Sequence, residues 1–386
     1  MQIMSSIARR SLRSVLVLSA VALTARPARA QANLSTQGFG YPSGQFSSRA
    51  WGTGGAIAEI DPLTQVNPAN MAMHTTRILT FQIEPEYRTV TSPNGTDHTS
   101  TSRYPNVFGA IPVGSRWVFA AGASSLLDRT STTLFNSVQV LHPGDSVPMK
   151  TQFSINGAMT DVQLIAAWNA RSWLRLGVGA HAISGHNLVQ VSQSFADTVQ
   201  FQPFTTSSMI GFSGTAASAG AQIVGKSLLF GLSGRVGSSL HSVVGDTILS
   251  RGRVPNHFGA SLAYMGITNS TIAIRTARDS WSSLNGLSPD SVSAVDGWDS
   301  SIGADIAGPR MGNRILFLRG GVRTRTLPFK ASGNTVRENS VAGGLGTTFA
   351  NGRVLTDFAA IYAKRDANIP ASEHSWTLSI GISIRP

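Results

Sequence analysis

Apolar residues alternate with small or polar residues along most of this chain. The last segment shows the pattern most clearly, because every second residue from Trp376 to Ile384 is apolar. The two faces are Trp376, Leu378, Ile380, Ile382 and Ile384 on one side and Thr377, Ser379, Gly381, Ser383 and Arg385 on the other. Successive side chains of a β-strand point to opposite faces of its sheet. The alternation therefore predicts strands that each have one apolar face.

Fifteen segments with this alternation are predicted to be strands, separated by clusters of turn-forming residues. They are residues 76–84, 104–113, 116–124, 161–169, 172–183, 187–198, 211–224, 227–236, 257–265, 271–278, 298–306, 314–326, 338–349, 353–364 and 376–385. Residues 187–198 form one of the weaker segments, and we expect them to belong partly to a loop. Residues 129–150 and 279–296 are polar with turn signals, so we expect two long external loops, the second with a helical turn near Trp281.

Such alternation fits either a soluble sandwich with inward apolar faces or a membrane barrel with apolar faces toward lipid. The second face favours the barrel, because it holds Gly, Ser, Thr, Ala and occasional Arg where a water-exposed face would hold Lys and Glu. Five tryptophans near predicted strand ends fit an interfacial girdle, although a soluble core is the alternative. They are Trp117, Trp168, Trp173, Trp298 and Trp376. We predict an all-β fold, an antiparallel transmembrane β-barrel of about 14 strands, with roughly 12 or 16 as alternatives.

The composition agrees with a barrel and excludes other classes. Only 13% of the 386 residues are charged, and 41% are hydrophobic, whereas soluble domains are roughly 25% charged. The absence of cysteine excludes a disulfide scaffold. The formal net charge is +12, but the arginines are dispersed along the strands. We therefore expect no nucleic-acid partner, and we attribute the charge to attraction for anionic lipid headgroups.

Residues 1–30 have the three parts of a secretory signal peptide. Arginines come first, an apolar run from Val15 to Ala25 follows, and Ala28-Arg29-Ala30 supplies the small residues of a cleavage site. The apolar run is shorter than the roughly 20 residues of a membrane anchor. We predict export and cleavage, which leaves residues 31–75 as a leading segment and residues 76–386 as the barrel.

The leading segment carries a resemblance to a known family. It is rich in Gly, Ala and Asn, and it contains Gly54-Gly55, an acidic turn at Asp61 and the element Asn67-Pro68-Ala69. It resembles the amino-terminal hatch of the FadL-type family of outer-membrane barrels, whose superfamily includes the PorV-type proteins. The carboxy-terminal third is similar to the same superfamily, through Leu318 to Arg325, Leu327-Pro328-Phe329, Glu338, Ala342 to Gly346, Asp357 and Trp376 to Gly381.

The sequence departs from the family pattern in two places. Asn70 stands where a glycine commonly follows Asn-Pro-Ala, which bears on the local turn. The chain ends in Ile384-Arg385-Pro386, without the terminal aromatic residue typical of bacterial barrels. The second departure concerns recognition by the barrel assembly machinery, which is an expected partner of such a protein.

The resemblance implies a bacterial outer-membrane barrel that transports hydrophobic or amphiphilic solutes such as long-chain fatty acids. The hatch would gate the path, and the gating residues would be Gly54, Gly55, Asp61, Asn67, Pro68 and Ala69. The PorV-type branch implies an alternative, a non-transporting scaffold that binds secreted proteins or components of a secretion system. The expected partners are outer-membrane lipids and hydrophobic small molecules, with secreted proteins in the scaffold alternative.

Strand phase places a set of arginines on the faces that point away from lipid. They are Arg175, Arg235, Arg275, Arg319, Arg323 and Arg325. An arginine that faces hydrocarbon costs roughly 2 to 4 kcal/mol at the bilayer midplane, so the lumen is favoured. Guanidinium groups in the lumen could hold the carboxylate of an amphiphile. The alternatives are pairing with Asp357 or Glu338, a position near strand ends, and contact with lipid phosphates at the rim.

We predict no enzymatic activity, no cofactor and no metal site. The chain lacks a Gly-x-Ser-x-Gly nucleophile elbow and a phosphate-binding loop. Its eight histidines are scattered, and His181 and His186 fall on opposite faces of one strand, which makes them poor partners for a metal ion. A hydrolase would require a serine beside a histidine, and a chance pairing of the two is the ordinary expectation.

Overall fold

A computed structural model describes residues 34, 39–93, 95–142, 145–196, 201–287, 293–312 and 314–386. The predicted signal peptide, residues 1–30, lies outside the described residues. The chain divides into two compact units, which are described separately below. The larger unit comprises residues 32–131, 154–189 and 207–386, and the described part of the smaller unit lies within residues 132–153 and 190–206.

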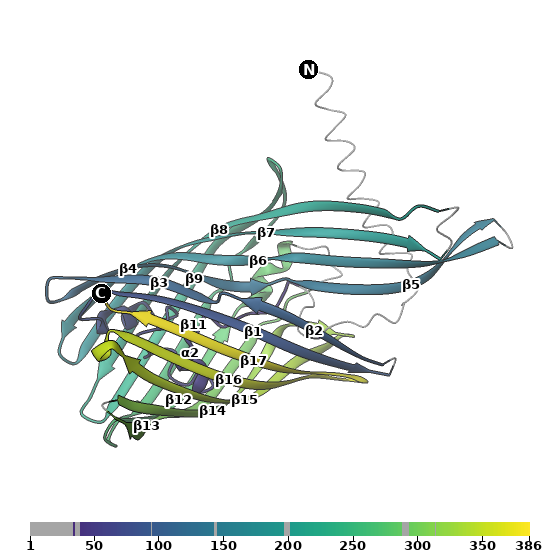
Figure 1. Ribbon diagram of the computed structural model, residues 1–386. Coiled ribbons are helices and arrows are strands. Elements are labelled where there is room, and N and C mark those ends of the chain that lie inside the picture. The colour runs from purple at the N-terminus through teal and green to yellow at the C-terminus, as the bar shows by residue number, and fades with distance from the viewer. Residues whose placement is uncertain are drawn as a thin grey trace. The chain divides into compact units, whose positions relative to one another are not determined.

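Strands dominate the described residues, and the few helical segments are short (Figure 1). The strands are β1 (Ile78–Ser92), β2 (Gly95–Arg103), β3 (Asn106–Val113), β4 (Trp117–Asp128), β5 (Ser131–His142), β6 (Asp145–Arg171), β7 (Leu174–Phe195), β8 (Phe204–Val224), β9 (Leu228–Val244), β10 (Thr247–Arg253), β11 (His257–Tyr264), β12 (Ser270–Asp279), β13 (Gly297–Met311), β14 (Arg314–Ala331), β15 (Asn334–Phe349), β16 (Val354–Ile369) and β17 (Ala371–Ile384). The helical segments are α2 (Ser48–Gly52), η1 (Pro68–Met73), η2 (Trp281–Leu287) and η3 (Ala350–Gly352). No helix among the described residues is long and apolar enough to cross a membrane.

These strand segments form a closed antiparallel barrel of 14 strands. Three barrel strands are each interrupted once, because β2 and β3 both pair with β1, β10 and β11 both pair with β9, and β4 and β5 both pair with β6. Pro105 lies in the first gap and Pro255 in the second. A proline has no N–H to donate to a neighbouring strand, which explains an interruption there. The ring closes where β1 pairs with β17, from Leu79 opposite Ile384 to Thr91 opposite Ser372.

The predicted fold class is therefore confirmed. Fifteen segments were predicted for fourteen barrel strands because one strand was divided into two segments. The predicted segments 172–183 and 187–198 are parts of one strand, β7, which runs from Leu174 to Phe195. Of the segment that was expected to belong partly to a loop, residues 187–195 are strand, Ala196 lies beyond the strand end, and residues 197–198 lie outside the described residues. The segment is weak as a sequence signal because polar residues interrupt its apolar face.

The smaller unit contains parts of β5 and β6 and parts of β7 and β8. Within it, Ala196 N donates to Pro148 O at 3.0 Å, and the hydroxyls of Ser192 and Thr205 lie 3.0 Å apart. The loop predicted over residues 129–150 is wrong, since most of this range is strand. Its Thr and Ser content hides the alternation that Leu134 and Val138 retain.

Where the strands of the larger unit have an apolar stripe, as on β4 and β17, the stripe points outward, as the alternation predicts. On β17, Trp376 is 55% exposed and Leu378 is 44% exposed, whereas Ser375 and Ser379 are buried. On β4, Phe119 is 49% exposed while Ala120 is buried. A soluble sandwich would show the opposite arrangement, with the large apolar side chains buried. The outer surface is therefore the apolar face, and the small residues face the interior.

Four of the five tryptophans of the predicted girdle, Trp117, Trp168, Trp173 and Trp298, lie at or near strand ends. Trp117 begins β4 and is stacked on Trp168 of β6, with 5.7 Å between ring centroids. Trp173, Trp298 and Trp376 are all more than half exposed, so none belongs to a buried core. Trp376 lies within β17 and not at the strand end. Its ring contacts the ring of Tyr362, with 5.1 Å between the centroids.

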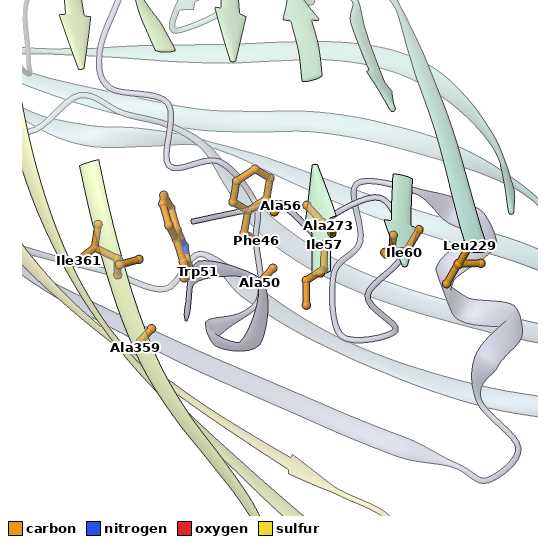
Figure 2. Packing of buried hydrophobic residues seen from close by; sticks show 13 residues of the cluster. Phe46, Ala50, Trp51, Ala56, Ile57, Ile60, Leu229, Ala273, Ala359 and Ile361 are labelled. Atoms are coloured by element: carbon orange, nitrogen blue, oxygen red, sulfur yellow. The ribbon is translucent and has the colours of Figure 1, made fainter. Parts of the chain in front are cut away.

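The leading segment lies inside the barrel and packs against its inner wall. Figure 2 shows Phe46, Trp51 and Ile57 of this segment gathered with Leu229 of β9 and Ile361 of β16. Phe46 and Trp51 meet edge to face, with 5.3 Å between ring centroids. The small inward residues of the wall make this possible, because larger side chains would occupy the space of the backbone that packs there.

A second plug comes from the loop between β12 and β13. The predicted helical turn is confirmed as η2, but the expectation of an external loop is wrong for this part, because Trp281 and Leu284 are buried. They pack in an apolar cluster with Met159, Ile183 and Phe212 from the inner wall. The hatch and the η2 loop thus both fill the interior of the barrel.

Candidate functional site

The Asn-Pro-Ala element forms a capped turn that is locked against the wall. Asn67 is the N-cap of η1, because its Oδ1 accepts from the Ala69 N–H at 3.0 Å. Its Nδ2 donates to the Glu59 carbonyl at 2.7 Å, and Pro68 takes the first helical position, where no N–H is needed. A Cβ atom at Gly220 of β8 would collide with the Asn67 side chain. The wall glycine therefore allows the turn to approach.

Asp61 is the polar centre of the hatch. Its carboxylate accepts hydrogen bonds from Ser47 Oγ at 2.5 Å and from Thr64 Oγ1 at 2.9 Å, and Arg49 Nη1 lies 3.5 Å away. Ser47 is also the N-cap of α2, since its Oγ accepts from the Ala50 N–H at 2.9 Å. Asp61 therefore links the start of α2 to the part of the hatch around Thr64.

Gly54 and Gly55 form a turn that other residues would strain. Their φ angles are +66° and +89°, in the left-handed region that favours glycine. A Cβ atom at Gly55 would lie 2.6 Å from the Phe46 ring, and one at Gly54 would lie 3.1 Å from the backbone of Val322 on β14. The predicted gating glycines are therefore positions where the hatch bends sharply against the wall.

Asn70 stands where the family pattern has a glycine, and its side chain makes hydrogen bonds that a glycine could not make. Its Nδ2 donates to the carbonyls of Ala58 and Thr64, both at 3.0 Å, and its Oδ1 accepts from Gln222 Nε2 of β8 at 2.6 Å. The side chain thus closes the hatch loop upon itself and fixes it to the wall.

A chain of alternating charges links the hatch to the barrel. Glu59 of the hatch lies 3.1 Å from Arg275 of β12, which lies 2.8 Å from Asp299 of β13, and Asp299 in turn binds Arg323 of β14 at 2.7 Å. Burial raises the pKa of Glu59, but His257 and Arg275 beside it outweigh burial and bring its pKa to about 2. The hatch carboxylate is therefore held as an anion among the arginines of the wall.

The structure places the six predicted arginines on the inner faces of their strands. Arg175 donates to Gln222 at 3.1 Å, and Arg235 lies 3.3 Å from Asp161. Arg275 pairs with Glu59 and Asp299, and Arg323 also pairs with Asp299. Arg319 lies 3.3 Å from Asp305 and 2.7 Å from Asp357, and Arg325 lies 2.6 Å from Glu338. Pairing with Asp357 and Glu338, an alternative from the sequence, thus occurs. Binding of an anionic solute stays a prediction for these residues.

A second charged cluster surrounds Tyr41, and the sequence did not single it out. Arg365 of β16 is fully buried and donates to Glu86 at 2.8 Å, to Glu338 at 2.7 Å and to the Tyr41 hydroxyl at 2.9 Å. The Tyr41 hydroxyl also donates to Glu338 at 2.8 Å. The inward phase of Glu86 and Arg365 on their strands is the signal that could have identified both residues.

A cavity of about 60 Å³ lies between the hatch, the inner wall and the η2 loop. This volume holds roughly four to six water molecules. Its apolar lining includes Phe46, Val66, Leu126 and Trp281. Three of the arginines that line it keep a buried N–H without a hydrogen-bond partner among the described residues, namely Arg235 at Nε, Arg323 at Nη1 and Arg325 at Nη2. The cavity therefore combines an apolar lining with arginines whose hydrogen-bonding capacity is not fully used.

Comparison with solved structures shows which fold this is. A FadL homologue from Pseudomonas aeruginosa superposes with a TM-score of 0.62 at 11% identity, over 90% of this chain and 99% of the other. The chain has the FadL-type barrel fold. The monoaromatic hydrocarbon channel CymD has a TM-score of 0.57 at 14% identity, over 88% and 97% of the two chains. The Pseudomonas putida toluene transporter TodX has a TM-score of 0.55 at 13% identity, over 91% and 99%.

No protein-family model matches the chain, and no curated protein matches its sequence. The likeness of this FadL-type barrel to other proteins is therefore a likeness of fold. Within the described ranges, no group of three or more His, Asp or Glu side chains is arranged to hold a metal ion. The chemistry available in the interior is that of arginine, carboxylate, amide, histidine and hydroxyl side chains.

Proposed function

We propose that this FadL-type barrel lies in a bacterial outer membrane and passes hydrophobic or amphiphilic solutes through a lumen that the hatch closes. The observation that carries the proposal is the interior cavity, where apolar side chains lie next to guanidinium groups with unused N–H donors. Such a cavity can accept an apolar body and a polar or anionic head at the same time.

The outer surface supports the membrane location. Large apolar residues are exposed on strand after strand, including Leu79, Phe119, Leu164, Val322 and Phe358. A surface of this kind would drive aggregation in water, whereas acyl chains are its natural solvent. The polar and charged residues of the same strands point into the interior, where the hatch satisfies many of them.

The lining of the cavity favours an amphiphile with a carboxylate head. Arg325 Nη2 and Arg323 Nη1 could donate to the two oxygens of a carboxylate, while Phe46 and Trp281 contact the apolar part. Long-chain fatty acids have this chemistry. Small aromatic hydrocarbons, for which CymD and TodX are named, would use the apolar lining alone.

Passage requires movement of the plugs. The cavity of about 60 Å³ is far below the 300 to 1,000 Å³ of typical ligand sites. Either the hatch or the η2 loop must shift before a fatty acid can enter. The hatch is the better gate, since many of its contacts with the wall are hydrogen bonds and ion pairs, which can be exchanged for contacts with water.

Flux into vesicles tests the proposal. Purified protein in lipid vesicles should accelerate the entry of oleate and of toluene over empty vesicles. Arg325→Gln should slow oleate while leaving toluene unchanged, and Glu338 stays paired because Arg365 still binds it at 2.7 Å. Arg278→Gln, which changes an exposed arginine, is the matched control.

Equal flux of both solutes with and without the protein would reject transport. That outcome, together with capture of secreted proteins by the purified barrel, is what the scaffold alternative predicts. Loss of both fluxes in Arg325→Gln would reject the assignment of this residue to the solute head.

A further inference from the structure

Three inward residues on neighbouring strands form a hydrogen-bonded chain that solute transport does not require. They are Asp161 on β6, His181 on β7 and Ser218 on β8. His181 Nδ1 lies 2.8 and 3.0 Å from the two Asp161 oxygens, and His181 Nε2 lies 2.7 Å from Ser218 Oγ. An ionised carboxylate only accepts, so the Nδ1–H donates to Asp161 and Nε2 accepts from the serine hydroxyl. This order of donors is the one that activates a serine nucleophile.

The acid of this chain is itself held in place. Gln45 Nε2 of the hatch donates to Asp161 Oδ2 at 3.1 Å, and Arg235 Nη1 lies 3.3 Å from the same oxygen. Asp161 is 1% exposed, and His181 and Ser218 are each 8% exposed. All three residues line the cavity, and the acid is the most deeply buried and is held by two partners, while the base and the nucleophile keep slightly more exposed surface.

A donor for a developing negative charge stands next to the serine. Arg235 of β9 is the direct cross-strand partner of Ser218, and both side chains point inward. Arg235 is 7% exposed, and its Nε–H has no hydrogen-bond partner among the described residues. A buried, unused donor beside a nucleophile is suited to stabilise the oxyanion of a tetrahedral intermediate.

We propose that the lumen holds a hydrolytic site, with Ser218 as nucleophile, His181 as general base and acid, Asp161 as the residue that orients His181, and Arg235 as oxyanion donor. The substrate class is small carboxylic esters with an uncharged, apolar acyl group. The apolar lining by Phe46, Val66 and Leu126 accepts such a group, and the small cavity limits its size. This activity goes beyond transport and differs from the sequence-based expectation of no enzyme.

The reaction proceeds in two balanced steps. Ser218 Oγ attacks the ester carbonyl carbon, its proton passes to His181 Nε2, and the carbonyl electron pair moves to the oxygen beside Arg235. The intermediate collapses, the C–O bond of the alcohol breaks, and the alcohol leaves with the proton from His181 Nε2. Water then attacks the acyl-serine carbon and gives its proton to His181 Nε2. That proton returns to Ser218 Oγ as the carboxylic acid leaves.

A fluorophosphonate probe tests the site directly. Ser218 Oγ should form a P–O bond as the P–F bond breaks, and peptide mass spectrometry of the labelled, folded barrel should place the adduct on Ser218. p-Nitrophenyl acetate should be hydrolysed by the same preparation. Ser218→Ala should remove both signals, and Asp161→Asn should slow them at least about 100-fold while keeping a side chain of the same shape.

Ser301→Ala is the matched control, because Ser301 is a buried inward serine of β13 whose hydroxyl has no partner among the described residues. It should label and hydrolyse like the parent protein. The altered electrophoretic mobility of an unheated barrel verifies folding of every variant. No adduct on Ser218 in folded protein overturns the proposal, as does an adduct whose rate is unchanged in Asp161→Asn.

Discussion

Replacing Asn67 with alanine should loosen the hatch. The change removes the side-chain cap of η1 and leaves the Ala69 N–H and the Glu59 carbonyl without their present partners, at 3.0 and 2.7 Å. Loss of an N-cap costs about 1 kcal/mol, and a buried group left unsatisfied costs about 1 to 3 kcal/mol. Water that enters the gap recovers part of this, so we expect a net cost of about 2 kcal/mol to the closed state. That cost corresponds to a roughly 30-fold larger population of the open hatch.

Ion conductance in planar bilayers measures this population, because an open lumen passes small ions. Asn67→Ala should raise the time-averaged conductance roughly 30-fold over the parent protein. Asn334→Ala changes an exposed residue at the start of β15 and should leave the conductance unchanged. Conductance of folded Asn67→Ala within about threefold of the parent would refute the claim that the Asn67 contacts hold the hatch closed.

Three further predictions concern the same plugs. Gly220→Ala should raise conductance as Asn67→Ala does, because its methyl group takes the space of the Asn67 side chain, and an unchanged value would contradict the close packing. Trp281→Ala should destabilise the η2 loop by about 3 to 5 kcal/mol, measured as faster protease cleavage between β12 and β13 than in the parent. The pKa of Glu59 is about 2 in the folded protein against an ordinary 4.5. Its stabilising contribution is therefore complete above pH 4.5 and is lost as the pH falls through about 2, which unfolding at graded pH should show and Glu59→Gln should abolish.

Most of the barrel could be predicted from the sequence, because alternation is a local property. Trp376 and Leu378 point outward, as their two-residue spacing indicates. This can be predicted without knowing which strands pair with β17. The strand at residues 131–142 could not be predicted in this way, because both of its faces mix apolar residues with Ser, Thr, Asn or Gln. Alternation between apolar and polar residues disappears when both faces carry hydroxyls.

The site was predictable only in part, because it depends on distant pairs. The inward phase of Arg323 follows from its own strand, whereas its pairing with Asp299 follows from the register of β13 against β14. His181 lies 20 residues from Asp161 and 37 residues from Ser218, and no local motif joins them. The residues meet because β6, β7 and β8 are neighbours in the sheet. Their register, which the sequence does not show, places the three side chains side by side.

A reversible lock on the hatch tests the central claim that the hatch gates the lumen. Ser48 of α2 and Ser379 of β17 have their Oγ atoms 2.9 Å apart, and the chain contains no cysteine. The double variant Ser48→Cys/Ser379→Cys can therefore form a single disulfide between hatch and wall. The measurement is oleate flux into vesicles that hold this variant, before and after reduction. The account predicts flux at the level of empty vesicles when the disulfide is formed and recovery on reduction, whereas equal flux in the two states would contradict it.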